Sequence, residues 1–174
     1  SSGEEVWSLA MVLADALGLQ ADWRVQGSDL STKVLAIAAA GHYPLERNEG
    51  IGPERLRRYC LKGVGSQHGT FLIDPALRGH VDFRQHNLME TPQDVTLFDV
   101  IFIRNVMIYF NLESKQRVMD QVLSRLRPGG HLFISHTESL FRIDCKLRAV
   151  RPSIYRKEAP CRPPGPRASA ASPS

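Results

Sequence analysis

Apolar side chains recur at intervals of three and four positions in three stretches, and this spacing predicts three amphipathic helices. The first helix spans Glu4–Leu17 and is followed by a glycine in the usual stop position. The second begins at an N-cap on Ser31 and is closed by Gly41, and the third begins at an N-cap on Asn111. Pro128-Gly129-Gly130 is expected to end the third helix.

Short runs rich in apolar residues predict the strands. Phe98–Ile103 is a near-continuous apolar run, which is typical of a strand buried on both faces of a parallel sheet. Shorter runs predict strands at residues 23–27, 131–135, 146–150 and 153–156, the last two forming a closing hairpin. Strands that alternate with helices favour an α/β fold, with helices on both faces of the sheet and ligands bound beyond the carboxyl ends of its strands.

Residues 42–80 differ from this alternation because they mix glycine, proline and charge. They hold a short helical piece at residues 53–61, and strands are expected at 71–73 and 81–83. We interpret about 42–80 as a small β insertion in one domain that spans residues 1–157. Residues 158–174 are rich in Pro, Ala, Ser and Arg, which predicts a disordered basic tail.

The composition is that of an ordinary globular protein, with 174 residues of which 43% are hydrophobic. No apolar run approaches the roughly 18 residues of a membrane helix, and no secretory signal is visible. The three cysteines, Cys60, Cys145 and Cys161, are odd in number and far apart. This pattern fits neither a disulfide framework nor a zinc site and suits the reducing cytoplasm.

The net charge of +4 is unevenly distributed. Residues 1–141 carry 14 Lys and Arg against 16 Asp and Glu, whereas residues 142–174 carry 8 against 2. Nucleic-acid surfaces need clustered cations on the folded body, so a nucleic-acid partner is not expected. The basic C-terminal end is either a solvated tail or a contact for an acidic partner or lipid headgroups.

Two acidic positions near the first helix and strand are candidate ligand contacts. Ser1-Ser2-Gly3 resembles the end of a glycine-rich turn that lets a ligand approach the helix, although a flexible terminus would look the same. Glu4 in the first turn also complements the helix dipole. Asp29 lies where nucleotide-binding α/β folds place an acid that accepts from ribose hydroxyls, and a capping or turn aspartate is the alternative.

Polar residues that follow predicted strands are further candidates. Arg104 and Asn105 follow Phe98–Ile103 directly, and Asn87 has a comparable position after the strand at 81–83. Tyr109 either faces the same pocket or is a core tyrosine with its hydroxyl bonded to backbone. His136 and Glu138 also follow a strand, either at the pocket or as plain rim residues.

Other catalytic motifs are absent from the sequence. The six histidines show no HxxxH or HxH spacing, so no metal site is expected. There is no GxSxG elbow and no GxxxxGK[ST] loop, which argues against a serine hydrolase and a P-loop enzyme.

The run FDVIFIRNVMIYF at residues 98–110 closely resembles the signature of the CheR family, the chemotaxis-receptor glutamate O-methyltransferases. The flanking pieces SSGEEVWSLAMVLADALG, GSDLS, HNLME, LRPGGHLFISHTESL and SIY resemble other elements of that family in the same order. The similarity covers about residues 1–157. It implies a Rossmann-like fold and S-adenosyl-L-methionine-dependent methylation of glutamate side chains on chemotaxis receptors, by a monomeric cytoplasmic enzyme without metal.

The resemblance also assigns roles to individual positions. Its cofactor-binding positions fall on Glu4, Asp29, Asn87, Leu88, Asn105 and Val106. Asp29 would hold the ribose, Asn87-Leu88 would border the adenine, and Asn105-Val106 would lie by the methionine part. Arg104 and Tyr109 would be the catalytic residues near the transferred methyl. The insertion corresponds to a β-subdomain that in some family members grips a receptor peptide.

The family also has an N-terminal helical domain and a first central strand that this sequence lacks, so we expect a fragment truncated at its start. The missing strand is expected to leave a gap between its neighbours in the sheet, which exposes apolar surface. A non-catalytic receptor-binding module remains an alternative. A nicotinamide-dependent Rossmann enzyme is disfavoured, because there is no full GxGxxG.

Overall fold

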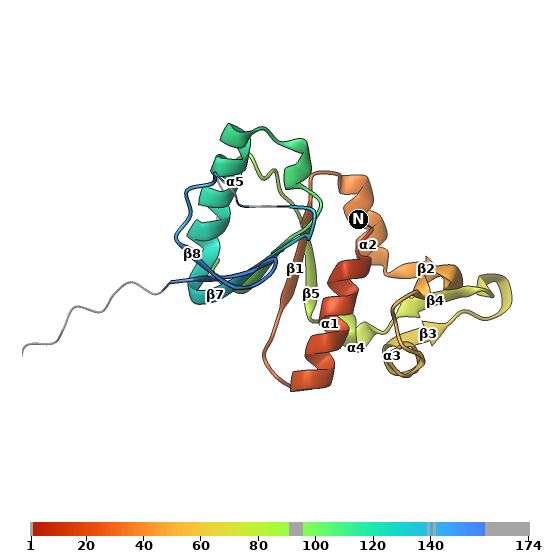
Figure 1. Ribbon diagram of the computed structural model, residues 1–174. Coiled ribbons are helices and arrows are strands. Elements are labelled where there is room, and N and C mark those ends of the chain that lie inside the picture. The colour runs from red at the N-terminus through yellow and green to blue at the C-terminus, as the bar shows by residue number, and fades with distance from the viewer. Residues whose placement is uncertain (1, 91–95, 139, 141, 159–174) are drawn as a thin grey trace, which may run out of the picture. The chain divides into compact units, whose positions relative to one another are not determined.

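The computed structural model describes residues 2–90, 96–138, 140 and 142–158, and it divides into two compact units (Figure 1). The first unit is Ser1–Asn87 and the second is Leu88–Ser174, and each is described by itself. The predicted tail lies outside the described residues except for Glu158. None of the described helices is long and apolar enough to cross a membrane.

The first unit contains a parallel strand pair covered by two helices (Figure 1). The elements are α1 (Glu4–Leu17), β1 (Val25–Asp29), α2 (Thr32–Ala40) and β5 (Val81–Gln85). Strands β1 and β5 pair from Val25 opposite Val81 to Asp29 opposite Gln85. A side chain at Gly27 would place its Cβ 2.8 Å from the Phe83 ring and 2.9 Å from Val6, so glycine is required for α1 and β5 to pack this closely.

The predicted caps of α1 and α2 are confirmed. Gly18 ends α1, and its amide donates to the Ala14 carbonyl. Ser31 Oγ accepts from the Val34 amide at 3.3 Å, and Gly41 ends α2 in the left-handed region, at φ 61°. The predicted strand at residues 23–27 starts two residues too early. Trp23 is instead buried, and its ring stacks on His80 at 4.1 Å.

The predicted insertion holds an antiparallel sheet of three short strands in the order β2-β4-β3. The strands are β2 (His42–Pro44), β3 (Cys60–Lys62) and β4 (Thr70–Ile73), with the helical pieces η1 (Leu45–Asn48), α3 (Pro53–Tyr59), η2 (Gly65–Gln67) and α4 (Pro75–Arg78) between or beside them. The helix expected at residues 53–61 ends at Tyr59, because Cys60 is extended and pairs with Ile73. The strand expected at 81–83 is β5 of the parallel pair.

The core of the first unit is built around α1. Its buried members include Trp7, Met11, Tyr43, Tyr59, Phe71, Ile73 and Leu77. The Trp7 ring meets Phe83 edge-on at 5.4 Å, and Asp15 on α1 accepts from Tyr59 at 2.7 Å. The apolar face that the three- and four-residue spacing predicts is therefore buried only in part, at Ala10 and Ala14, whereas Leu17 at the end of that face is 55% exposed.

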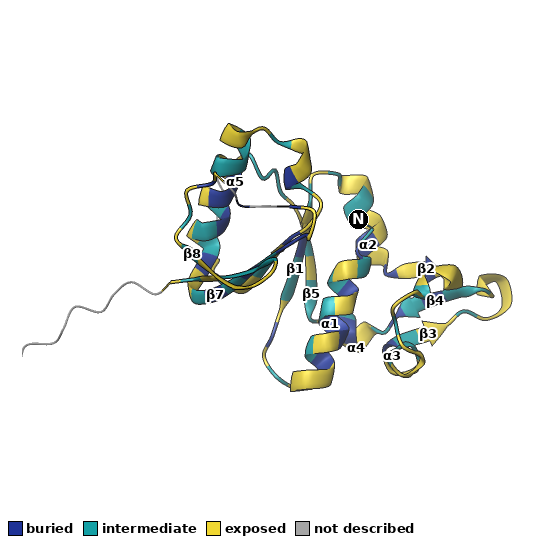
Figure 2. Cartoon of the chain, viewed as in Figure 1, coloured by how far each residue is buried: buried dark blue, intermediate teal, exposed yellow. Residues whose placement is uncertain are grey.

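The second unit is a four-stranded mixed sheet with one long helix (Figure 2). Its elements are β6 (Phe98–Ile103), η3 (Met107–Tyr109), α5 (Leu112–Arg125), β7 (Leu126–Ile134), β8 (Leu147–Arg151) and β9 (Ile154–Lys157), with the strand order β6-β7-β9-β8. Strands β6 and β7 are parallel, and β8 and β9 form the predicted antiparallel hairpin. Asn111 caps α5 as predicted, with its Oδ1 accepting from the Ser114 amide at 2.9 Å.

Strand β7 begins earlier than the sequence predicts. The sequence predicts that residues 128–130 separate the helix from the following strand. In the structure, α5 ends at Arg125 and β7 starts at Leu126. Leu126 pairs with Phe98, and the register then shifts before His131 pairs with Val100. The irregular pairing accommodates the proline and glycines within the strand.

The two faces of β6 differ in burial. Ile103 is buried in the core with Val118, Met119 and Leu132. The sequence predicts burial on both faces, whereas Val100 and Phe102 are 44% and 41% exposed. The Phe102 ring stacks on Phe133 of β7 at 4.5 Å, which partly covers this second face within the described residues.

Candidate functional site

The predicted site residues lie beyond the carboxyl ends of parallel strands in each unit. In the first unit, Asp29 ends β1 and Asn87 follows β5. In the second unit, residues 104–106 follow β6 directly. These strand ends are where α/β folds bind their ligands, so the placement agrees with the expectation from the pattern.

Asp29 is held by the turn that leads into α2. Its Oδ1 accepts from the Ser31 amide at 2.9 Å, and its carbonyl accepts from the His86 amide at 3.1 Å. The side chain is half-buried. Asp29 therefore makes a turn contact to the amide of Ser31, in line with the plainer interpretation, and this contact orients its carboxylate at the strand end.

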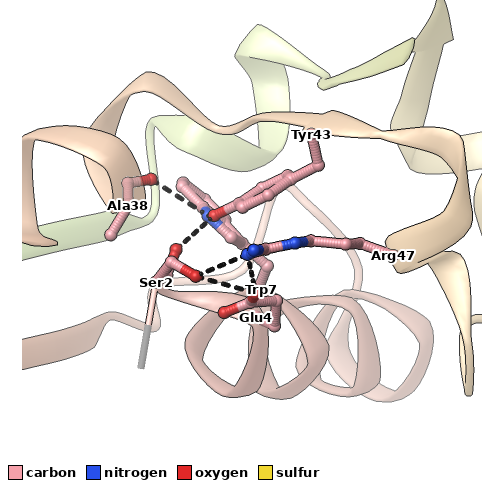
Figure 3. Close-up of polar contacts among 6 residues, drawn as sticks. All are labelled: Ser2, Glu4, Trp7, Ala38, Tyr43 and Arg47. Atoms are coloured by element: carbon pink, nitrogen blue, oxygen red, sulfur yellow. Dashed lines mark hydrogen bonds and ion pairs between the residues drawn. The ribbon is translucent and has the colours of Figure 1, made fainter. Parts of the chain in front are cut away.

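The start of α1 is tightly fixed to α2 and to the β insertion (Figure 3). Tyr43 donates to the Ser2 carbonyl at 2.7 Å, and Trp7 Nε1 lies 3.1 Å from the Ala38 carbonyl. Gly3 has φ 96°, and a Cβ at this position would lie 2.7 Å from the Ala38 Cβ. Small size and a left-handed backbone are thus both required at Gly3.

Glu4 is engaged by neighbours within the first unit. Its Oε1 accepts from Ser2 Oγ at 2.8 Å and from Arg47 Nη1 at 2.9 Å, as Figure 3 shows. Burial alone would raise the pKa of the Glu4 carboxyl, but hydrogen bonds from its own amide, Ser2 and Arg47 lower that pKa below its ordinary value. No local pattern predicts that Arg47 contacts Glu4, because 43 positions separate the two residues.

A hollow of about 230 Å³ opens at the ends of β6 and β7 in the second unit. Its lining comprises Phe102, Arg104, Phe133, Ile134, His136, Pro152, Ser153 and Ile154. Arg104 is the predicted catalytic residue among these. His136, one of the weaker candidates, also lines the hollow, and its Nδ1 lies 3.2 Å from Ser153 Oγ.

Residues 105 and 106 form the turn between β6 and η3. Asn105 is exposed and has φ 58°, a left-handed conformation that asparagine tolerates better than most residues. Val106 and Leu88 are partly buried and pack against the core of the second unit. Tyr109 is 80% exposed on η3, so its interpretation as a core tyrosine is wrong.

The position of Glu138 after a strand predicts a residue at the pocket or at its rim, but the structure shows a different role. Its side chain is buried at 9% exposure and turns toward the backbone. Oε1 accepts from the amides of Val106 at 2.9 Å and Met107 at 2.8 Å, and Oε2 accepts from the Ser135 amide at 3.0 Å. The carboxylate thus joins the ends of β6 and β7. In the described part of the chain, no group of three or more His, Cys, Asp or Glu residues could hold a metal ion.

Comparisons with known proteins show a family to which most of the chain is similar. The family model described as CheR methyltransferase, SAM binding domain, matches residues 1–155. The chemotaxis protein methyltransferase of Escherichia coli (strain K12) is 36% identical over 157 residues, covering 89% of this chain and 55% of that protein. The chemotaxis protein methyltransferase of Salmonella typhimurium (strain LT2) is 39% identical over 157 residues, with 89% and 54% covered. The chain thus spans about half the length of these relatives.

Among solved structures, the N-methyltransferase NodS from Bradyrhizobium japonicum WM9, in complex with S-adenosyl-L-homocysteine, aligns with a TM-score of 0.39. It is 17% identical in sequence, and the alignment covers 64% of this chain and 40% of that chain.

Proposed function

This chain belongs to the CheR methyltransferase family, and from this premise we propose that it transfers methyl groups from S-adenosyl-L-methionine to glutamate side chains of chemotaxis receptors. The match of residues 1–155 to the family's cofactor-binding domain carries the proposal. The relatives are named chemotaxis protein methyltransferases, which favours an enzyme over a non-catalytic receptor-binding module. We further propose that it works in the cytoplasm, in keeping with the free thiols of the two described cysteines, Cys60 and Cys145.

The polar groups at the strand ends suit this cofactor. Asp29 offers carboxylate oxygens, which accept hydrogen bonds from hydroxyl groups such as those of a ribose, and its fixed orientation favours such contacts. Asn87 and Leu88 combine a polar amide with an apolar side chain, as an adenine requires. We propose that Asn105 and Val106 contact the methionine part.

Glu4 is the least direct of the proposed cofactor contacts. Its carboxylate already accepts from Ser2 and Arg47, so a cofactor ammonium group would share it with the arginine. Glu4 is ionised at neutral pH, and the hydrogen bonds that lower its pKa hold the charged carboxylate in a fixed position, which favours contact with a cation.

Methyl transfer to a carboxylate depends on the positioning of the two reactants more than on acid-base groups. When bound, the cofactor supplies a methyl group activated by its positively charged sulfur. A receptor glutamate is ionised at neutral pH, so the carboxylate needs no general base. We propose that Arg104, in the hollow at the ends of β6 and β7, orients this carboxylate by a charge-assisted hydrogen bond. Tyr109 would contribute from η3, where its side chain is exposed.

Calorimetry with S-adenosylhomocysteine tests the proposed cofactor contacts. Asp29→Ala removes an ionised hydrogen-bond acceptor, so we expect affinity to fall about 10- to 100-fold. Asp22→Ala is a matched control, because Asp22 is an exposed aspartate of the same unit. For Asn105, both Asn105→Ala and Asn105→Gly should weaken binding, although glycine keeps the left-handed backbone.

Radiolabelled methyl transfer to receptor-containing membranes tests the substrate. Arg104→Gln should lower transfer while leaving the affinity for S-adenosylhomocysteine unchanged, because we assign Arg104 to the receptor carboxylate. Full affinity in both Asp29→Ala and Asn105→Gly would contradict the proposed cofactor site. Receptor binding without any cofactor binding would support the module instead.

A further inference from the structure

The turn after β6 has backbone amides that its own helix does not satisfy. In the one-turn helix η3, the amides of Tyr109 and Phe110 donate to the carbonyls of Val106 and Met107. The amides of Val106 and Met107 themselves lie at the start of this turn, where no earlier carbonyl of the turn accepts from them. The Met107 side chain is buried at 1% exposure, so water is a poor substitute for a protein acceptor at this position.

Glu138 supplies the missing acceptor from the neighbouring strand end. Its Oε1 accepts from the Val106 amide at 2.9 Å, across 32 positions of sequence, and from the Met107 amide at 2.8 Å, across 31 positions. Its Oε2 accepts from the Ser135 amide, and its own amide donates to the Ser135 carbonyl, each at 3.0 Å. One buried carboxylate therefore fixes the backbone after β6 to the backbone after β7.

We infer that Glu138 is a positioning residue that holds Asn105 and Val106 in their binding conformation. Asn105 directly precedes the two bonded amides and has φ 58°, a left-handed conformation that asparagine tolerates but that is still less populated than the right-handed one unless neighbouring contacts hold it. The bonds from the next two amides to Glu138 provide that constraint. This inference rests on the proposed function, in which Asn105 and Val106 contact the cofactor.

Glutamine is the sharpest replacement because it keeps the shape of the side chain. Glu138→Gln retains one carbonyl oxygen, which serves either the Val106-Met107 pair or Ser135 but not both. The amide group that replaces the other oxygen is a donor and faces another donor. Glu113→Gln is the matched control, since Glu113 is an exposed glutamate of the same unit that pairs with Arg117 on α5.

The test combines hydrogen exchange with calorimetry on the same proteins. In Glu138→Gln we expect the amides of Val106 and Met107 to exchange at least tenfold faster, and the affinity for S-adenosylhomocysteine to fall about tenfold. The far-UV circular dichroism melting curve, which reports general loss of structure, should shift little. Glu113→Gln should change neither the exchange nor the affinity. If Glu138→Gln does not fold, exchange in the unaltered protein decides, and unprotected Val106 and Met107 amides would overturn the inference.

The outcomes separate this inference from the function on which it rests. Unchanged affinity in Glu138→Gln, with weakened affinity in Asp29→Ala, would overturn the positioning role and leave the proposed function intact. A fall in affinity that only parallels a fall in melting temperature would also overturn it, because that is the result of a purely structural role. Unchanged affinity in Asp29→Ala, Asn105→Gly and Glu138→Gln together would overturn both.

Discussion

Replacing Gly3 by alanine tests how tightly the start of α1 is packed. The new Cβ would lie 2.7 Å from the Ala38 Cβ and 3.1 Å from the Tyr43 hydroxyl, well inside the ordinary carbon contact distance of about 3.5 Å. Overpacking of this kind costs about 1–3 kcal/mol. The backbone at φ 96° adds strain of about 1–2 kcal/mol for a non-glycine residue. We therefore expect Gly3→Ala to lower the free energy of unfolding by about 2–5 kcal/mol.

Two further variants separate the two contributions. Gly50 has φ 85° and nothing within 4 Å of a Cβ, so Gly50→Ala should show the backbone strain alone, about 1–2 kcal/mol. Ala38→Gly removes the Cβ that a side chain at residue 3 would meet, at the cost of about 1 kcal/mol for glycine in a helix. The double variant Gly3→Ala/Ala38→Gly should be more stable than the sum of the single effects predicts, by about 1–2 kcal/mol.

Tryptophan fluorescence during urea unfolding is the suitable assay. Both tryptophans of the chain, Trp7 and Trp23, lie in the first unit, so their emission reports the unit that contains Gly3. An equal loss of stability in Gly3→Ala and Gly50→Ala would refute the close packing. Additive effects in the double variant would show that residues 3 and 38 do not meet.

Three other predictions follow from burial and charge. Burial raises the pKa of the Cys60 thiol to about 11, so at pH 8 iodoacetamide should alkylate it about 100-fold more slowly than a thiol of ordinary pKa 9.0; equal rates, followed by mass spectrometry, would contradict this. The lowered pKa of Glu4 means that the hydrogen bonds to its carboxylate from its own amide, Ser2 and Arg47 stabilise the fold above pH 4.5, and this stabilisation is lost as the pH falls through the lower folded pKa. Urea unfolding at several pH values tests this. Glu4→Gln should be less stable than the unaltered protein by at most about 1 kcal/mol at pH 7 and equally stable near pH 2. A difference in stability that does not depend on pH would argue against the ion pair. Leu132 is fully buried and Leu112 is 50% exposed, so Leu132→Ala should cost about 2–5 kcal/mol and Leu112→Ala at most about 0.5 kcal/mol, measured by circular dichroism during unfolding; similar losses would mean that the core is misassigned.

The long elements could be predicted because their signals are local. Helix α1 has the predicted bounds, and the caps Ser31 and Asn111 each accept from an amide three residues ahead. Strand β6 likewise has the bounds that the sequence predicts, Phe98–Ile103. Periodicity, capping side chains and apolar runs depend on neighbouring residues, so the sequence contains all the information that these elements need.

The short strands β2 and β3 and the start of β7 could not be predicted because distant partners decide them. The strand β2 is three residues long and exists through its pairing with β4, about 28 positions later. Leu126 belongs to β7 because it pairs with Phe98, although proline and glycine follow it closely in the sequence. Local preference is weak at these positions, and tertiary hydrogen bonds override it.

The acidic residues of the candidate site illustrate the same limit in chemical terms. A carboxylate that follows a strand of an α/β sheet is a candidate ligand contact, and both Asp29 and Glu138 have this position. Both oxygens of Glu138, however, accept from backbone amides, which makes it a support for the neighbouring turn. Predicting this would require the register that sets Ile103 beside Ile134 and so brings residues 106 and 138 within reach. The carboxylate of Glu138 is thus already used by amides at two adjacent strand ends, and the sequence alone does not reveal which strand ends are adjacent.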